Sequence, residues 1–480
     1  MTPAWRERLP PGPWDAVVVG SGPNGLAAAI TLAREGRRVL VLEAAERAGG
    51  GLRSAELTEP GFTHDLCATI FAIGAVSPFL RSLPAGTCEW VVPPLALAHP
   101  FDDGGAAILD RSVATTAAGL GADAPAWART FGALVDRWDA VAADALGPLR
   151  VPRHPLLLAR FGLDAMRSAD VLARARFAGT HARALFAGLA AHGNLPLDGA
   201  ATAAIGLVLG ATAHAGGWPV AKGGSQRIAD GLVTHLASLG GTVVTGARVA
   251  SLDELPSAPC VLLDVTPRQL VAMAGVRLPV RYRRRLERFR LGAGIFKVDY
   301  ALESPIPWRA RECVRAATVH LGGTLDEIGR SEAAVARGEA PERPFVILVQ
   351  PTLFDPSRAP MGRHVAWAYG HVPNGWRGDL LPRIEAQIER FAPGFRDIVR
   401  ARSIWDPARL EADNPNHTGG DIGGGAADLR QLFARPVLSL DPYATPLPGV
   451  FLCSSSTPPG AGAHGLCGWH AARSALRWGF

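Results

Sequence analysis

The sequence predicts a mixed α/β fold, and three observations lead to that prediction. A short apolar stretch at 15–19 runs into a glycine-rich turn and then into an alanine-rich stretch with helical spacing. Glycine-rich stretches recur far apart in the chain, at 49–51, 217–226 and 459–468. Between them lie one mostly helical and one strand-like region. We therefore expect an α/β domain built from separated segments beside a sheet-plus-helix domain, α+β overall.

The first glycine turn has the form of a nucleotide-binding turn. It consists of Gly20, Ser21, Gly22, Pro23, Asn24 and Gly25. Gly20 permits a tight turn, Gly22 lets backbone approach a pyrophosphate, and Gly25 lets the helix at 24–34 pack close to the strand. The free N–H groups at that helix start favour phosphate. A second strand, 38–42, ends in Glu43, placed to accept hydrogen bonds from a ribose. This order is the fingerprint of a Rossmann-type dinucleotide-binding domain.

The segment after the second strand distinguishes between NAD and FAD as the cofactor. Glu43 argues against the 2′-phosphate of NADP but fits both NAD and FAD. An NAD domain would continue its strand–helix alternation, whereas this chain has a second glycine-rich stretch at 47–54. Here the sequence resembles the amine oxidase and phytoene desaturase superfamily of flavoproteins, in which such a segment wraps the diphosphate. The similarity continues through 56–57, 60–65 and 77–78. That longer pattern resembles the phytoene desaturase-like branch, including its pyridine nucleotide-disulfide oxidoreductase domain 2 type.

The resemblance implies FAD as the cofactor, held by residues from both ends of the chain. In the superfamily, the strand expected at 242–249 meets the adenine near Val249, and the one at 260–264 completes the parallel sheet. The closing stretch, 454–468, resembles the second FAD motif, although Ser454-Ser455 stands where relatives have Gly-Ala or Gly-Asp. Serine hydroxyls can hydrogen-bond a ribityl chain. The implied contacts are Gly20, Ser21, Gly22, Pro23, Asn24, Gly25, Glu43, Ala44, Gly50, Gly51, Leu52, Val249, Thr266, Ser455, Gly465 and Leu466.

These pieces divide the chain into two discontinuous domains. We expect the FAD-binding domain at 1–75, 217–275 and 440–480, and the substrate-binding domain at 76–216 and 276–439, with its helical part at about 120–215. The expected helices are 126–146, 200–213, 227–239, 380–391 and 466–478. The further expected strands are 292–301, 316–321, 344–349, 364–371 and 445–453.

Composition excludes several function classes. The chain has 480 residues, 48% hydrophobic and 19% charged, which is typical of a globular protein with an ample core. Its formal charge of +6 is spread along the chain, and no aromatic residues interleave as in a base-stacking surface, so we expect no nucleic acid partner. The arginine-rich run at 281–290 is predicted to be a solvated helix face. Residues 1–13 contain no apolar signal region, so a cytoplasmic location is expected, with peripheral membrane contact as the alternative.

The six cysteines show no metal-binding or redox spacing. We therefore expect no metal site. Cys67 and Cys467 neighbour the cofactor motifs, but without a C-x-x-C arrangement they are expected to pack as thiols beside the cofactor.

The resemblance also implies a reaction: an apolar, isoprenoid- or carotenoid-like molecule would be desaturated or oxidised by hydride transfer to flavin N5. The electron acceptor, whether oxygen, a quinone or another carrier, stays open, as does a reaction that runs as a reduction or isomerisation. The candidate groups near the ring are His64, Asp65, His214, His417, Asp421 and His464. His417 and Asp421 lie in a glycine-rich loop before the last strand and are predicted to be proton acceptor or substrate anchor. A structural hydrogen bond from His417 to a loop carbonyl is the alternative.

Two other functions stay open. Amine or protoporphyrinogen-type oxidases share the FAD frame, and an aromatic cage beside the flavin would favour amines, although the chain has only four tyrosines. The Rab GDP-dissociation inhibitors share the nucleotide fold but bind prenylated proteins without catalysis. They lack a working flavin site, so the paired motifs argue against that function here.

Overall fold

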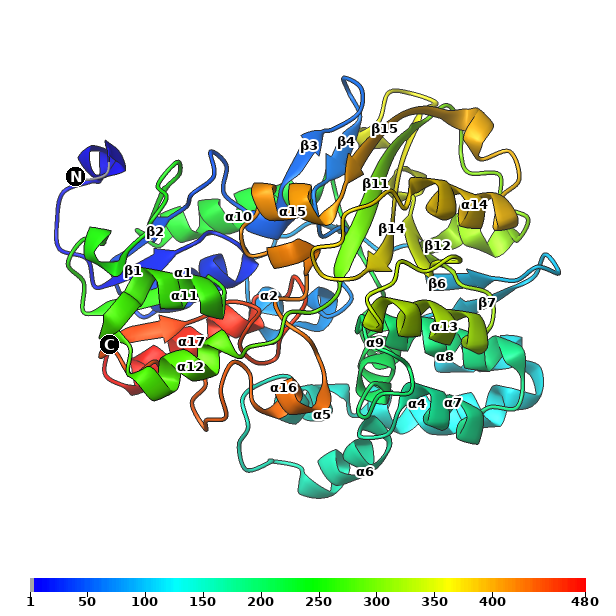
Figure 1. The fold of residues 1–480 in the computed structure, drawn as a ribbon, viewed down its shortest axis with the longest axis horizontal. Coiled ribbons are helices and arrows are strands. Elements are labelled where there is room, and N and C mark those ends of the chain that lie inside the picture. The colour runs from blue at the N-terminus through cyan, green and yellow to red at the C-terminus, as the bar shows by residue number, and fades with distance from the viewer. Residues whose placement is uncertain (1–3) are drawn as a thin grey trace.

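The computed structural model describes residues 4–480, and a parallel sheet occupies one end of the molecule (Figure 1). The strand order is β16-β10-β1-β2-β9, with every neighbouring pair parallel. Its strands are β1 (Ala16–Val19), β2 (Val39–Leu42), β9 (Thr242–Val244), β10 (Cys260–Leu263) and β16 (Val450–Leu452). They come from the start, middle and end of the chain. The predicted α/β class is confirmed.

Helices cover both faces of this sheet because its short strands are buried on both sides. One face packs against α1 (Pro23–Arg34), α10 (Ser225–Ser238) and α17 (Leu466–Arg477), and the other against α11 (Pro267–Ala274) and α12 (Val280–Glu287). Glycine permits the closest approaches. A Cβ on Gly25 would lie 2.0 Å from the Gly20 carbonyl oxygen, and one on Gly468 would lie 1.7 Å from that of Asn24.

The second sheet has seven strands in the order β15-β11-β14-β13-β12-β6-β7. They are β6 (Leu95–Pro100), β7 (Ala106–Leu109), β11 (Gly294–Leu302), β12 (Ala316–Leu321), β13 (Val346–Val349), β14 (His364–Val372) and β15 (Val399–Trp405). All neighbours are antiparallel except β12 and β6. Two small pairs join it to the first sheet: β3 (Ser54–Glu56) with β4 (Thr63–Asp65), and β5 (Trp90–Val91) with β8 (Val220–Ala221).

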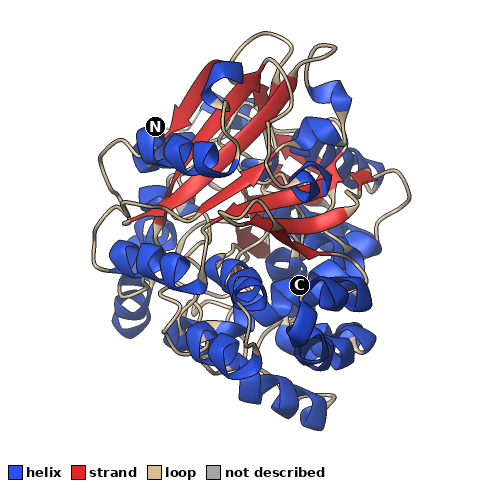
Figure 2. Cartoon of the chain, turned by 90° about the vertical axis from the view of Figure 1, so that its right-hand side faces the viewer, coloured by secondary structure: helices blue, strands red, loops and turns tan. Residues whose placement is uncertain are grey.

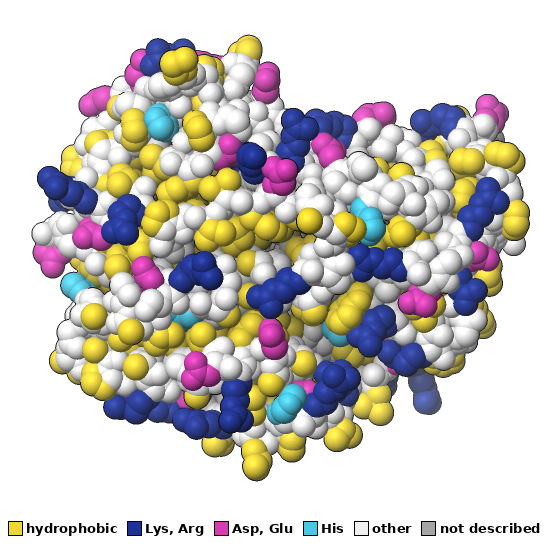
Figure 3. All heavy atoms as spheres, turned by 180° about the vertical axis from the view of Figure 1, so that it is seen from behind, with side chains coloured by type: hydrophobic (Ala, Val, Ile, Leu, Met, Phe, Trp, Pro, Cys, Tyr) yellow, Lys and Arg dark blue, Asp and Glu magenta, His cyan; other side chains and the backbone are white. Residues whose placement is uncertain are grey.

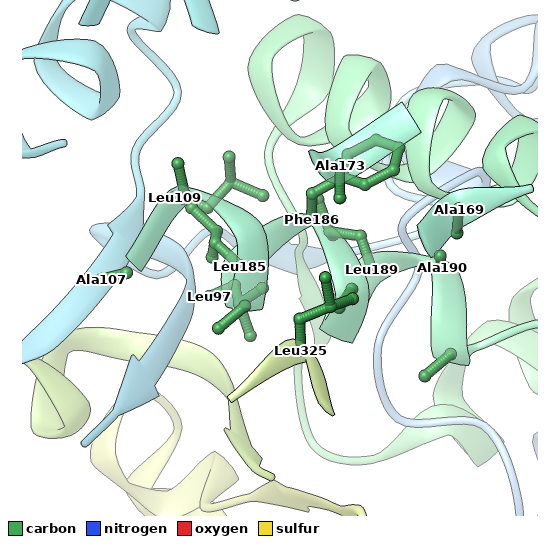
Figure 4. Close-up of a cluster of buried hydrophobic side chains, with 14 of the residues drawn as sticks. Leu97, Ala107, Leu109, Ala169, Ala173, Leu185, Phe186, Leu189, Ala190 and Leu325 are labelled. Atoms are coloured by element: carbon green, nitrogen blue, oxygen red, sulfur yellow. The ribbon is translucent and has the colours of Figure 1, made fainter. Parts of the chain in front are cut away.

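A layer of helices packs under the second sheet, and Figure 2 shows the strands gathered above and helices below. The helices of this layer are α4 (Ala124–Asp136), α5 (Trp138–Ala145), α6 (Pro155–Ala165), α7 (Ala169–Arg176), α8 (Thr180–Ala191) and α9 (Ala203–Gly216). Figure 4 shows Leu185 and Leu189 of α8 among Leu97 of β6, Leu109 of β7 and Leu325. The opposite face of the sheet is covered by α14 (Leu381–Phe391). The remaining helices are α2 (Pro78–Arg81), α3 (Val113–Gly119), α13 (Leu325–Ala336), α15 (Pro407–Asp413) and α16 (Leu429–Phe433).

Several element predictions need correction. The strand expected at 242–249 ends at Val244, because the chain turns at Gly246 with a φ of 61°. The helix expected at 126–146 is divided at Arg137, which has a non-helical ψ of 26°. Strands β6 and β7 lie in a region expected to be mostly helical, since the fully buried run of β6 has no alternation to mark it. No helix in the described part of the chain is both long and apolar enough to cross a membrane.

Candidate functional site

One cavity of about 1050 Å³ extends from the parallel sheet to the second sheet. It begins at the carboxyl ends of the parallel strands, where open α/β sheets bind ligands. We call its two parts the glycine-lined half and the apolar half. The glycine-lined half is bordered by Gly20, Gly22, Pro23, Asn24, Glu43, Ala44, Gly50, Gly51, Val249, Asp264, Thr266 and Ser455. The apolar half is bordered by Leu158, Phe161, His192, Ala204, Ile205, Val208, Leu209, Trp218, Thr318, Ile347, Val349, Trp367 and Tyr369.

The floor of the glycine-lined half is bare backbone. A Cβ on Gly22 would lie 2.8 Å from Asp264 Oδ2, and one on Gly50 would lie 2.9 Å from the Gly22 Cα. Gly20 and Gly50 have φ values of 98° and 53°, which side chains disfavour. Because these glycines meet at the start of α1, the floor fits a diphosphate that contacts backbone closely.

Asp264 lies beside that floor, at the end of β10. Its Oδ2 accepts a hydrogen bond from the Gly25 N–H at 3.0 Å, so a carboxyl group caps the start of α1. Burial raises the pKa of Asp264 to about 7, opposed by the Gly25 hydrogen bond and assisted by the nearby Glu43 charge. The group therefore changes charge near neutral pH.

Glu43 is held rigidly at the cavity wall. Its Oε2 accepts the Ser21 N–H at 2.8 Å and the Ser21 hydroxyl at 2.6 Å, and its Oε1 accepts the Ala45 N–H at 2.8 Å. A carboxylate has about four lone-pair positions, so one remains for a ribose hydroxyl. Ser21 lies beneath the acid and supports it.

The two ends of the chain meet at Asn24 and Ser455. Asn24 Nδ2 donates to Ser455 Oγ at 3.3 Å, and buried Asn24 Oδ1 has no hydrogen-bond partner within residues 4–480. Arg435 fixes this segment by donating to the carbonyl oxygens of Ser455 at 3.0 Å and Gly424 at 2.8 Å. Sequence reasoning missed Arg435, since no motif contains it. The unpartnered amide oxygen marks a polar position for a ligand.

Five residues expected to contact the cofactor do not line the cavity: Ser21, Gly25, Leu52, Gly465 and Leu466. Leu52 and Leu466 are core residues beside α1. Gly465 starts α17 with a φ of 70°, and a Cβ there would lie 2.8 Å from Phe79. Gly25 is enclosed by Gly20 and Asp264. These positions lie behind the residues that border the cavity, as expected where a motif specifies close packing as well as contact with the ligand, and their contact with the cofactor stays a prediction.

Among the six polar groups predicted near the ring, only His417 lines the cavity. Burial lowers its pKa to about 4, with Arg53 adding to the effect. Its Nε2 lies 3.4 Å from Asn414 Nδ2, and buried Nδ1 has no hydrogen-bond partner within residues 4–480. The alternative hydrogen bond to a loop carbonyl is thus absent from the described part of the chain. His417 is neutral at physiological pH and has a free ring nitrogen, as a proton acceptor requires. Its catalytic role stays a prediction.

Asp421 instead organises the loop that carries His417. Its carboxylate accepts the backbone N–H groups of Gly292 at 2.7 Å, Gly423 at 2.8 Å and Gly425 at 2.8 Å. Burial raises its pKa, and these donors oppose that rise. With three donors fixed on its carboxylate, Asp421 fits a positioning residue better than a catalytic group.

The other predicted polar groups belong to the scaffold. His464 accepts the Leu466 N–H at 3.0 Å, and His214 accepts the Trp127 N–H at 3.2 Å. His64 Nε2 lies 2.8 Å from Thr58 Oγ1. Asp65 belongs to a buried charge cluster, paired with Arg358 at 2.5 Å. Trp127 and Arg358 are distant in sequence from His214 and Asp65, so the spacing of those two residues gave no sign of their roles.

A buried ion pair between Asp65 and Arg358 connects the segments that carry the two halves of the cavity. Asp65, at the end of β4, also accepts the Ser225 N–H at the start of α10 at 2.7 Å. Nearby, Lys297 of β11 donates to the Asp65 carbonyl at 3.0 Å and to Asp299 at 2.6 Å. Burial disfavours ionisation of Asp65, but Arg358 and the hydrogen-bond donors lower its pKa below the usual value. The cluster therefore joins the glycine-rich segment after β2 to the second sheet.

All six cysteines are free, and burial raises the pKa of Cys67 to about 11 and that of Cys467 to about 12. Both thiols are therefore protonated and weakly reactive. In the described part of the chain, no group of three or more His, Cys, Asp or Glu side chains is arranged to hold a metal ion.

Comparison with known proteins agrees with this geometry. Residues 18–83 match the family described as an NAD(P)-binding Rossmann-like domain. The mouse pyridine nucleotide-disulfide oxidoreductase domain-containing protein 2 is 25% identical over 575 residues, covering 99% of this chain and 96% of that protein. Zebrafish all-trans-retinol 13,14-reductase is 40% identical over 95 residues, which are 18% of this chain and 14% of that protein.

The fold is shared with an enzyme of known structure. A putrescine oxidase bound to putrescine superposes with a TM-score of 0.60 at 18% identity, covering 98% of this chain and 99% of that chain. The full-length relative, the matching nucleotide-binding domain and this shared fold confirm the resemblance found in the motifs: the chain is similar over its whole length to the pyridine nucleotide-disulfide oxidoreductase domain 2 type and has the fold of putrescine oxidase.

Proposed function

We propose that the protein is an FAD-dependent oxidoreductase that oxidises or desaturates an apolar, isoprenoid-like small molecule. The observation that supports this most is the single cavity, which joins a backbone-lined nucleotide site to an apolar chamber without a break. A cofactor in one half would meet a substrate in the other.

The glycine-lined half fits FAD. Gly20, Gly22 and Gly50 would admit the diphosphate, Glu43 the ribose, and Asn24 with Ser455 the polar chain toward the ring. When bound, the flavin supplies hydride acceptance. The protein's part is to orient the substrate and exclude water.

The walls of the apolar half favour a hydrocarbon-rich substrate. Ile205, Val208 and Leu209 of α9 border the cavity, as do Ile347 and Val349 of β13. Burying apolar ligand surface against such walls contributes about 25 cal/mol per Å². His417 is our proposed proton acceptor, because it is neutral and has a free ring nitrogen beside the cavity.

The aromatic residues do not favour an amine substrate. Trp367 and Tyr369 stack at 5.5 Å with an interplanar angle of 13°, and both come from β14. Two rings stacked on one strand form part of one wall, whereas a cage needs rings on opposite sides of the amine. The intact glycine-lined half also argues against the non-catalytic, prenyl-binding alternative.

Exposed apolar residues lie in the cavity lining and on a helix that contributes to it, which supports peripheral membrane contact. Leu149 and Phe433 line the cavity and are partly exposed. Leu156 and Leu163 of α6, the lowest helix in Figure 1, are 88% and 77% exposed. Figure 3 shows hydrophobic side chains among Lys and Arg along the lower edge of the opposite view. This pattern fits an anionic membrane surface from which an apolar substrate could enter.

The purified chain tests the proposal. Its visible absorption spectrum should be that of oxidised flavin, and cofactor released by denaturation should be FAD at about one per chain. Under anaerobic conditions, a panel of isoprenoid hydrocarbons and alcohols should bleach the flavin, whereas simple amines should not. A colourless protein that cannot be reconstituted with FAD would defeat the proposal.

A further inference from the structure

Three polar side chains interrupt the apolar half. Trp218 and Thr318 line it, and both are 1% exposed. Neither the indole N–H of Trp218 nor the hydroxyl of Thr318 has a hydrogen-bond partner within residues 4–480. His192, at the end of α8, lines the same cavity. Buried polar groups are nearly always paired, so unpartnered ones in side chains that border a cavity are available to a polar ligand atom that reaches them.

The three side chains gather around His320 of β12. His192 Nε2 lies 2.9 Å from His320 Nε2, and the His192 ring is 5.7 Å from the Trp218 ring in an edge-on arrangement. Thr318 lies two residues before His320, so both point to the same face of the sheet. Groups from α8, β12 and the segment before β8 therefore converge on one part of the cavity wall.

The electrostatics of this cluster favour a neutral ligand. Burial lowers the pKa of His192 to about 3, with His371 adding to the effect, so the ring is uncharged at physiological pH. Burial and the neighbouring histidines likewise lower the pKa of His320. The adjacent acid, Glu332, is already paired with His371 at 2.8 Å. An ammonium would find no free carboxylate here, and a carboxylate no cation, within the described residues.

Backbone strain lies in the same wall. Asn194 and Ala201, in the connection between α8 and α9, have φ values of 52° and 65° and both line the cavity. They are the non-glycine residues with positive φ among residues 4–480. Asparagine tolerates this conformation, but it is sterically unfavourable for alanine. Strain of this kind gathers where a fold holds a binding wall in one shape.

We propose that Trp218, Thr318 and His192 bind a neutral oxygen, the hydroxyl or carbonyl at one end of an otherwise apolar substrate. Trp218 can only donate, whereas Thr318 and His192 can donate or accept, so the cluster fits either group. The proposal rests on the function proposed above and narrows its substrate from a hydrocarbon to an apolar alcohol or ketone. A cavity built to hydrogen-bond such a group discriminates against the analogue that lacks it.

Isothermal titration calorimetry of the full chain with four ligands of one carbon skeleton tests this inference. The ligands are farnesol, farnesene, farnesoic acid and farnesylamine. Farnesol should bind about tenfold more tightly than each of the others, the gain expected when a ligand satisfies buried donors. Equal affinity for farnesol and farnesene, tighter binding of the acid or amine, or no binding of any ligand would overturn it.

Variants separate hydrogen bonding from packing. Trp218→Phe and Thr318→Val should each weaken farnesol binding about tenfold and leave farnesene binding unchanged. Trp308→Phe is the matched control, because its buried N–H is also unpartnered within the described residues but does not line the cavity. Equal losses for farnesol and farnesene would show a packing role and contradict the inference. Flavin content, measured separately, reports on the proposed cofactor, so the two proposals can fail independently.

Discussion

The two halves of the cavity bind by different means. In the glycine-lined half the wall is backbone, and its few charged groups, such as Glu43, are held by short hydrogen bonds. In the apolar half the wall is made of side chains, and its polar groups at Trp218 and Thr318 have no partner within residues 4–480. We infer that the first half is fixed in advance for a cofactor, whereas the second leaves hydrogen bonds free for a substrate. A substitution in one half should therefore change ligand binding in that half and leave binding in the other half unchanged.

The largest effect is expected where the halves are joined. Arg358→Met should lower the free energy of unfolding by about 3–5 kcal/mol, because it leaves Asp65 buried without its partner. Chemical denaturation followed by circular dichroism measures this. Arg363→Met is the control, since its pair with Glu303 is exposed and should contribute less than about 1 kcal/mol. Equal losses in the two variants would show that the buried cluster does not join the halves.

A side chain on the cavity floor should weaken cofactor binding without affecting the apolar half. A Cβ on Gly22 would lie 2.8 Å from Asp264 Oδ2, so Gly22→Val should displace the backbone floor that we propose for the diphosphate, and FAD affinity should fall about hundredfold. Fluorescence titration of the apoprotein with FAD measures this. Gly132→Ala, at a helix position with open space, should bind FAD normally. Farnesene affinity should stay unchanged in both variants; its loss from Gly22→Val would contradict the independence of the halves.

A charge in the apolar half should have the opposite effect. Val208→Asp places an unpaired carboxylate among apolar side chains, and we expect farnesene affinity to fall ten- to hundredfold while flavin content stays at the wild-type level. Val276→Asp, at a residue that is 91% exposed, is the control and should change neither. Loss of flavin from Val208→Asp at an unchanged melting temperature would contradict this prediction.

Asp264 should make only the glycine-lined half sensitive to pH. Its pKa of about 7 lies above the usual value, so the folded state holds this proton more tightly than the unfolded state. The stability that it contributes is present at low pH and is lost as pH rises toward and through about 7. A diphosphate would repel the ionised carboxylate, so FAD affinity should fall by up to tenfold per pH unit above 7.

Asp264→Asn should remove that dependence. The amide keeps the shape of the side chain and stays uncharged, so FAD titrations at pH 6 and 8.5, values chosen about one unit or more on either side of the pKa, should give similar affinities. Farnesene binding should be insensitive to pH in both proteins. If FAD affinity depends on pH in the variant as it does in the wild type, a group other than Asp264 is responsible.

The smallest effect is expected at the opening of the apolar half. Replacing Leu156 and Leu163 together by Glu should reduce sedimentation with anionic phospholipid vesicles about tenfold, because two exposed apolar contacts become repulsive charges. Val276→Glu, at a similarly exposed residue directly after α11 that does not border the cavity, should sediment like the wild type. Equal sedimentation of all three proteins would show that Leu156 and Leu163 do not contact the membrane.

The glycine-lined half could be predicted from the sequence because glycine spacing has a local steric meaning. Gly20, Gly22 and Gly50 leave room that any side chain would fill, and Glu43 follows its strand directly. Leu52 shows the limit, since a motif contains packing residues as well as contacts.

The apolar half could not be predicted in the same way. Its polar cluster joins His192, Trp218 and Thr318, which are far apart in the sequence and belong to no motif. The α9 segment has the composition of a buried core helix, and the same apolar side chains can face a core or a cavity. Only the packing of α9 against the second sheet decides which of them border space.

The continuity of the two halves is tested most directly by the visible difference spectrum of the bound flavin when farnesol is added to the FAD-loaded protein. We expect a saturable shift of the flavin bands, with the dissociation constant found by calorimetry. Val208→Asp should lose that shift at farnesol concentrations that saturate the wild type. Farnesol that binds with no change in the flavin spectrum would contradict the account, because cofactor and substrate would then occupy separate sites.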